Sequence, residues 1–133
     1  MADIMNRLKE IGIIPVIKID DAKDAVPLAG ALIRGGLPCA EITFRTAAAK
    51  ESIPAVKKAN PQRLVGAGTV LNAQMVDDAM EAGAEFIVSP GLNPTTVKYC
   101  QEKNIPIVPG VATAGEVETA ISLGLETVKF FPA

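Results

Sequence analysis

Short apolar runs alternate with longer amphipathic stretches along the whole chain. The apolar runs, rich in Ile, Val and Leu, predict six strands at residues 13–19, 39–44, 64–68, 85–88, 105–108 and 126–131. The stretches between them predict helices at residues 22–34, 47–59, 73–82, 94–103 and 113–123, after a leading helix within residues 1–12. Strands that are apolar at nearly every position are typical of a parallel sheet covered on both faces, so the pattern predicts an α/β fold.

Turn-forming residues mark where the predicted helices begin and end. Asn72 and the pair Asn93–Pro94 precede helical stretches, as N-terminal capping residues do. Glycines follow four of the stretches and predict their ends: Gly12, Gly36, Gly83 and Gly124. Pro27 and Pro54 lie inside helical patterns, where a proline removes a backbone hydrogen bond.

Two α/β folds fit this alternation of strands and helices: a doubly wound sheet and a barrel. The sequence has neither a Gly-x-Gly-x-x-Gly turn nor a Walker loop. The carboxyl ends of the strands carry unusual residues instead, such as Gly68–Thr69, Ser89–Gly91 and Pro109–Gly110. In a (β/α)₈ TIM barrel these ends share one face, which holds the active site. The sequence therefore favours this barrel family, in one domain over residues 1–133 that contains about six βα units.

Composition narrows the possible chemistry. The 133 residues carry a net charge of −2 without a basic cluster and are only 4% aromatic, which argues against nucleic acid or an anionic membrane as a partner. The apolar runs are also far shorter than the ~18 residues of a membrane span. Histidine is absent, which removes Ser–His and Cys–His catalysis and imidazole-bound zinc. Cys39 and Cys100 are expected to be reduced core thiols of a cytoplasmic protein, with a disulfide or a reactive thiol as the alternative.

Lys129 stands inside the last apolar run, between Val128 and Phe130. Burying an ammonium group costs free energy, so a lysine in such a run usually serves a purpose. Apolar surroundings favour the neutral amine of a lysine, which is then free to attack a carbonyl. The alternative is a strand lysine that points to solvent at the edge of a sheet.

Glu41 and Arg45 are four residues apart on one predicted strand, with Thr43 between them. Because side chains on a strand repeat every two residues, all three are expected on the same face. A carboxylate and a guanidinium fit the mouth of a barrel better than its helix layer. A purely structural ion pair is the alternative.

Other polar positions have two interpretations each. Thr69 follows a pair of glycines and either presents its hydroxyl and N–H to a ligand or caps a helix. Pro90 either shapes a pocket wall or belongs to an ordinary turn. Lys18 stands beside two aspartates and is expected in solvent. The charged helix residues, among them Lys57 and Asp77, are expected on a solvated outer face.

An amine, a carboxylate, a guanidinium and a hydroxyl in one mouth suit chemistry next to a 2-oxo acid. Lys129 would condense with a keto group to give a protonated imine, which is an electron sink. Glu41 would move protons, directly or through a water, and Arg45 would hold a substrate carboxylate. The expected reaction is cleavage or formation of a carbon–carbon bond without a metal.

Two segments resemble the signatures of a known enzyme family. Gly36–Arg45 (GLPCAEITFR) is similar to the active-site signature of the bacterial KDPG/KHG aldolases, and Gly124–Ala133 (GLETVKFFPA) is similar to the start of their second signature. Gly66–Val70 and Ser89–Gly91 also fit, so the resemblance covers essentially the whole chain. The family consists of class I aldolases, carbon–carbon lyases that cleave 2-dehydro-3-deoxy-6-phosphogluconate to pyruvate and glyceraldehyde 3-phosphate. Some members cleave 4-hydroxy-2-oxoglutarate to pyruvate and glyoxylate.

The resemblance implies a role for each matching residue. Lys129 would form the imine, and Glu41 would accept and donate protons. The implied substrate contacts are Arg45 and Thr69 for the pyruvyl carboxylate and Pro90 and Phe131 for the pocket wall. The resemblance also implies a (β/α)₈ barrel without metal or cofactor, a small 2-oxo acid as substrate, a homotrimer, and a place in the Entner–Doudoroff pathway.

The chain is short for such a barrel, which usually takes ~250 residues and at least about 200. Strands seven and eight, whose loops often bind a substrate phosphate, are missing, so the domain is expected to be incomplete at its C-terminal end. The open sheet edges that remain are aggregation hazards. Three interpretations stay open: a fragment of a longer product, a barrel completed by a second chain, or an inactive truncated form.

Overall fold

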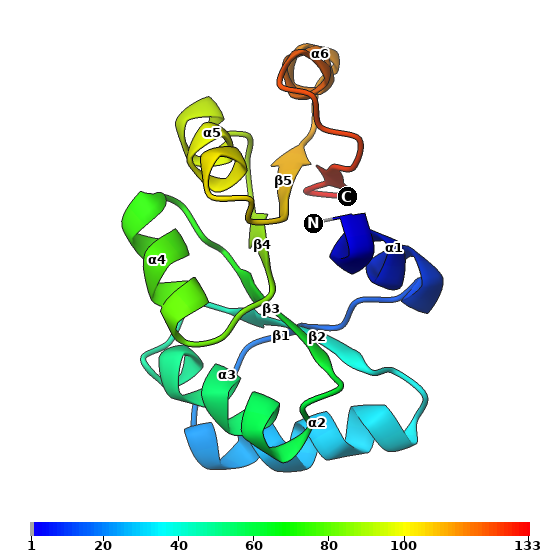
Figure 1. Cartoon of the computed structure of the whole chain (residues 1–133), viewed down its shortest axis with the longest axis vertical. Coiled ribbons are helices and arrows are strands. Elements are labelled where there is room, and N and C mark those ends of the chain that lie inside the picture. The colour runs from blue at the N-terminus through cyan, green and yellow to red at the C-terminus, as the bar shows by residue number, and fades with distance from the viewer. Residues whose placement is uncertain (1) are drawn as a thin grey trace.

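The computed structural model describes residues 2–133, and Met1 of the predicted leading helix lies outside the described residues. Helices and strands alternate along this range (Figure 1). The helices are α1 (Ala2–Ile11), α2 (Ala25–Arg34), α3 (Ala48–Ala59), α4 (Ala73–Glu81), α5 (Pro94–Glu102) and α6 (Ala114–Ser122), with a short 3₁₀ helix at Ala22–Asp24. The strands are β1 (Val16–Ile17), β2 (Cys39–Thr43), β3 (Leu64–Gly68), β4 (Phe86–Ser89), β5 (Ile107–Val111) and β6 (Lys129–Phe130).

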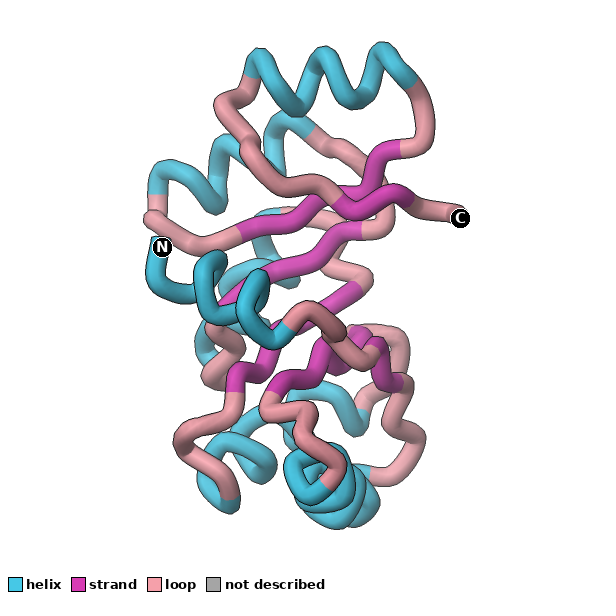
Figure 2. The backbone as a smooth tube through the Cα atoms, turned by 90° about the vertical axis from the view of Figure 1, so that its right-hand side faces the viewer, coloured by secondary structure: helices cyan, strands magenta, loops and turns pink. Residues whose placement is uncertain are grey.

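The strands form one parallel sheet in the order β1-β2-β3-β4-β5-β6. A strand order that follows the chain is that of a barrel, because a doubly wound sheet reverses its direction at a switch point. The sheet curls into part of a barrel, with α2 to α5 on its outer side and α1 on its inner side (Figures 1 and 2). The prediction of the barrel family is therefore confirmed.

The predicted helix caps are confirmed. The side chain of Asn72 accepts a hydrogen bond from the backbone N–H of Met75, and that of Asn93 accepts one from Thr95. The four glycines expected to end helices all have positive φ, which favours glycine. Pro27 proves harmless because α2 begins only at Ala25, which places the proline in the first turn, where its missing N–H would have no partner within the helix.

The first and last strands are much shorter than predicted. The runs at residues 13–19 and 126–131 form strands only at Val16–Ile17 and Lys129–Phe130. Each pairs with a single neighbour among the described residues, β1 with β2 and β6 with β5. An apolar run forms a strand only where a neighbouring backbone supplies hydrogen bonds, so the pattern alone overestimated both lengths.

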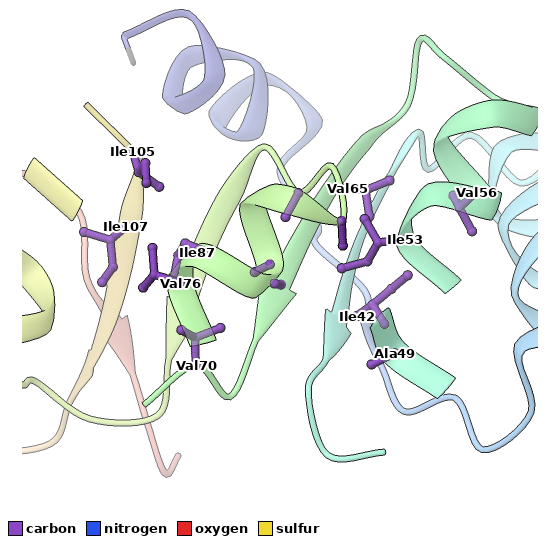
Figure 3. Packing of buried hydrophobic residues seen from close by; sticks show 14 of the residues in the cluster. Ile42, Ala49, Ile53, Val56, Val65, Val70, Val76, Ile87, Ile105 and Ile107 are labelled. Atoms are coloured by element: carbon purple, nitrogen blue, oxygen red, sulfur yellow. The ribbon is translucent and has the colours of Figure 1, made fainter. Parts of the chain in front are cut away.

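Alternate residues of the strands pack into two separate cores. The outer core joins Ile42, Val65 and Ile87 to side chains of α3 and α4, such as Ile53 and Val76 (Figure 3). The inner core contains the intervening strand residues together with α1: Leu8, Cys39, Leu64, Phe86 and Val88. The middle strands read as continuously apolar because both of their faces are buried.

Both cysteines are buried free thiols, as expected, and they cannot pair because they belong to different cores. Cys39 is in the inner core and Cys100 in the outer core. Burial raises the pKa of each thiol to about 11. Neither thiol is therefore a ready nucleophile.

Lys57 is a correction to the expected solvated helix face. Its ammonium lies 2.7 Å from Oε1 of Glu85 and donates to the backbone carbonyls of Pro61 and Arg63. Both side chains of the pair are about three-quarters buried, at 24% and 25% exposure. The end of α3 lies against the amino ends of the strands, which the helical pattern could not indicate. Asp77, by contrast, lies at the surface in an ion pair with Lys103.

Candidate active site

Glu41 lies in the middle of β2 and on its inner face, because it alternates with the outward-facing Ile42. Only 4% of the residue is exposed. Burial raises the pKa of the Glu41 carboxyl above its usual value, and the positive charges of Lys129 and Arg45 oppose this rise. A raised pKa makes the carboxylate a stronger base, which favours proton transfer to and from this group.

Lys129 lies on β6, opposite Gly110 of β5, and points into the curled sheet. Its Nζ is 3.8 Å from Oε1 of Glu41, which is an ion pair too long for a direct hydrogen bond. Nζ is also 4.9 Å from the centre of the Phe131 ring. β6 is the last strand of the sheet, and yet the side chain of Lys129 faces inward and is only 28% exposed. The structure thus brings Glu41 of β2 together with Lys129 and Phe131 at the other end of the sequence.

Lys129 and Glu41 share a cavity of about 580 Å³ inside the curled sheet, and Phe131 is not among its lining residues. Its wall is mainly apolar and comes from β1, β4, β5 and α1, with Val16, Phe86 and Val108 among the lining residues. Lys9, Glu126, Asn6 and Thr127 also line it, but only Lys129 and Glu41 are paired with each other. A mainly apolar cavity with a few convergent polar groups is typical of a site for a small molecule.

Arg45 is a correction to the sequence prediction. β2 ends at Thr43, and Arg45 lies exposed in the turn that follows, not on the same strand face as Glu41. It remains close enough for its charge to lower the pKa of the Glu41 carboxyl. The intervening Thr43 is buried, and its hydroxyl donates to the carbonyl of Ile17 at 3.2 Å, which ties β2 to β1.

Thr69 follows β3 at the carboxyl face with φ of 57°, in the left-handed region. A β-branched residue is strained there, by about 1–3 kcal/mol, and such strain is concentrated at functional sites. The alternative interpretation of Thr69 as a helix cap is wrong, because Asn72 caps α4.

Pro90 is not brought into the cavity of Lys129. It lines a separate hollow of about 380 Å³ together with Leu71 and Ser89. Lys18 lies outside both cavities and is exposed, with its ammonium 2.7 Å from Oδ1 of Asp20, as expected.

Two features of the site escaped the sequence prediction. Gly68 lies directly beneath the Glu41 carboxylate, and the Phe86 ring lies over Gly66. The sequence did contain a signal for this feature: Gly66 and Gly68 are two residues apart on one strand, so that face of the strand carries no side chains there.

Within residues 2–133 no cluster of three or more His, Cys, Asp or Glu is arranged to hold a metal ion. No helix of this range is long and apolar enough to cross a membrane.

The fold and the site together define a parallel βα-barrel protein with a lysine–glutamate pair on the inner face of its sheet. The family profile "KDPG and KHG aldolase" matches residues 4–133. The chain belongs to this family, as its two signature segments predicted.

Curated relatives agree with this assignment. A 2-dehydro-3-deoxy-phosphogluconate aldolase of Treponema pallidum is 47% identical over 133 residues, covering 100% of this chain and 63% of the relative. One of Haemophilus influenzae is 48% identical over 130 residues, covering 98% of the chain and 61% of the relative. The chain therefore spans less than two-thirds of the length of these relatives.

Solved structures match the fold. The 2-keto-3-deoxy-6-phospho-gluconate aldolase of Zymomonas mobilis superposes with a TM-score of 0.86 at 49% identity, over 90% of this chain and 58% of the other. A KDPG aldolase of Legionella pneumophila superposes with a TM-score of 0.87 at 40% identity, over 90% and 58%. That structure holds pyruvate as a covalent carbinolamine intermediate.

Proposed function

We propose that this chain provides the carbonyl-activating part of a class I aldolase that cleaves 2-dehydro-3-deoxy-6-phosphogluconate. The observation that carries the proposal is the Lys129–Glu41 pair, held 3.8 Å apart in a mainly apolar cavity. A substrate carbonyl above this pair would have an amine and a proton-transfer group within reach. Family membership and the relatives' names support the choice of substrate.

The reaction would begin with attack of the Lys129 amine on the C2 carbonyl. The resulting carbinolamine loses water to give a protonated imine. The bond between C3 and C4 then breaks, and its electron pair moves into the imine to form an enamine while Glu41, directly or through a water, takes the proton of the C4 hydroxyl. Glyceraldehyde 3-phosphate leaves, Glu41 returns a proton to C3, and water releases pyruvate from Lys129.

Other groups at the carboxyl face would bind the substrate. Arg45, in a turn near Glu41, would pair with the pyruvyl carboxylate, and Thr69 would donate its hydroxyl to the same group. Phe131 would form a wall beside Lys129, since its ring already faces the ammonium. Pro90 would contact substrate only from its neighbouring hollow.

The same site would serve 4-hydroxy-2-oxoglutarate, which gives pyruvate and glyoxylate, because both substrates share the 2-oxo acid end. Relatives called KHG/KDPG aldolase support this range. We further propose one domain over residues 1–133, a role in the Entner–Doudoroff pathway and a cytoplasmic location. For assembly we propose a homotrimer on the family resemblance.

Reduction with borohydride in the presence of pyruvate tests the proposal. Reduction fixes the imine as a stable secondary amine, and mass spectrometry of peptides should find a pyruvyl adduct on Lys129. Lys129→Ala should remove the adduct. The matched control Lys18→Ala should keep it, because Lys18 is an exposed residue that forms an ion pair with Asp20 outside the cavity. A wild-type chain without an adduct, or an adduct on Lys18, would refute the proposal.

A second candidate is an inactive chain that folds only by assembling. The observation behind it is the pair of open sheet edges, where β1 and β6 each pair on one side. Val16 of β1 is 56% exposed and Phe130 of β6 is 68% exposed, which is unusual for apolar side chains of a barrel. Size-exclusion chromatography with light scattering separates the two. A folded oligomer that traps no pyruvate supports the second candidate, and trapping by the purified chain excludes it.

A further inference from the structure

The inner face of β3 carries no side chain at two successive inward positions. Gly66 and Gly68 are both buried, and each lies under a side chain of a neighbouring strand. A Cβ atom at Gly66 would lie 2.2 Å from the Phe86 ring of β4. A Cβ atom at Gly68 would lie 2.1 Å from Oε1 and 2.8 Å from the carboxyl carbon of Glu41 of β2. These separations are shorter than any normal contact between carbon or oxygen atoms.

The backbone of β3 does not itself require glycine at position 68. Gly68 lies in a regular strand and is not among the glycines with positive φ. What marks this position is the close approach of the Glu41 side chain, three of whose atoms lie within 2.8 Å of where a Cβ atom would be. Glycine is therefore required at position 68 by the nearby Glu41 side chain and not by the local backbone conformation.

The space above Gly68 also fixes where the carboxylate can lie. In register, Glu41 is opposite Gly66, so its side chain leans toward the carboxyl end of β3 to reach Gly68. That lean brings Oε1 to 3.8 Å from Nζ of Lys129. The Glu41 side chain is 5% exposed and lines the cavity, so a carboxylate displaced from this space would move within the cavity and away from its present position beside Lys129.

We propose that Gly68 is a positioning residue of the reaction, which holds open the space that places the Glu41 carboxylate beside Lys129. The catalytic part of this inference rests on the proposed function. Gly68 itself touches no reacting atom and acts through Glu41. A methyl group at position 68 should therefore impair proton transfer at pyruvate C3 much more than formation of the imine on Lys129.

Two measurements on the same protein separate these steps. Borohydride trapping of pyruvate reports the imine, and exchange of pyruvate methyl protons for deuterium in D₂O, followed by NMR, reports proton transfer by Glu41. For Gly68→Ala we expect trapping within a few-fold of wild type and exchange slowed about tenfold to 100-fold, as expected for a catalytic group misplaced by about 1 Å. The control Gly115→Ala adds a methyl group where nothing lies within 4 Å and should change neither rate.

A stability cycle tests the contact itself and does not depend on activity. If the methyl group collides with Glu41, Gly68→Ala should lower the urea midpoint of the wild type. The same substitution should have little effect in a Glu41→Ala background, where the colliding atoms are gone. This comparison remains informative if Gly68→Ala alone fails to fold, because Glu41→Ala should then restore folding.

The outcomes are distinct. Wild-type protein that neither traps nor exchanges pyruvate would overturn the proposed function, while the stability cycle would still report whether Gly68 makes room for Glu41. Slow exchange with retained trapping, together with rescue by Glu41→Ala, would establish the positioning role. Wild-type exchange in Gly68→Ala, or an equal loss of stability in both backgrounds, would refute it.

Discussion

Replacing Lys129 by methionine removes the cation that faces Glu41 and keeps a side chain of similar length. In the wild type the two charged atoms are 3.8 Å apart, with the glutamate side chain 5% exposed and the lysine 28% exposed. Removing one partner of a fully buried pair costs about 3–5 kcal/mol, because the remaining charge is left without compensation. The partial exposure of Lys129 reduces this, and we expect a loss of about 1–3 kcal/mol in the free energy of unfolding near pH 8.

The loss should depend on pH because Glu41 can escape it by taking up a proton. Burial already raises the pKa of Glu41, and Lys129 opposes that rise, so the pKa of Glu41 should be higher still in Lys129→Met. The folded variant then holds a proton that the unfolded chain has released, and its stability falls as pH rises above the ordinary range of a glutamate. At about pH 4 the carboxyl is protonated in both proteins, and the difference should vanish.

Urea unfolding followed by circular dichroism at about pH 4 and about pH 8 measures this difference. In a Glu41→Gln background no carboxylate is left to compensate, and Lys129→Met should cost little at either pH. An equal loss at both pH values, or the same loss in the Glu41→Gln background, would show that the two side chains are not coupled as the structure indicates.

Three further predictions concern packing and thiol chemistry. Gly66→Ala should destabilise the fold by about 1–3 kcal/mol in urea unfolding, since its methyl group would meet the Phe86 ring; an unchanged midpoint would contradict the close approach. Ile53→Ala, at a side chain with 0% exposure in the outer core, should cost about 2–5 kcal/mol by the same measurement, and a loss below this range would mean that the core collapses around the cavity. Cys39 and Cys100 should react with a disulfide reagent at pH 8 only as the protein unfolds, because burial raises both thiol pKa values to about 11; rapid labelling of the native protein would refute this.

Much of the fold was predictable because parallel βα units have a strong local pattern. Strands covered on both faces must be apolar throughout, and glycines and asparagines at helix ends satisfy local backbone needs, so β2 to β5 and the helix caps lie close to the predicted positions. The lengths of β1 and β6 were not predictable, because a strand exists only where a second backbone pairs with it. The prediction that Arg45 shares a strand face with Glu41 failed for a related reason, because β2 ends at Thr43, before Arg45.

By itself the sequence determined the order of the helices and strands, the barrel family, and that the Glu41 side chain points to the inner face of the sheet. It could do so because the two-residue period of a strand and the chemistry of turn residues are local properties. Only the tertiary structure decided that Lys129 on an edge strand faces inward and lies 3.8 Å from a carboxylate 88 positions earlier (129 minus 41). Curling of the sheet creates that contact, and with it the buried surroundings that raise the pKa of Glu41 and the need for bare glycine beneath it. These contacts and the pKa shift depend on which side chains of different strands lie against one another, and no local pattern in the sequence contains that information.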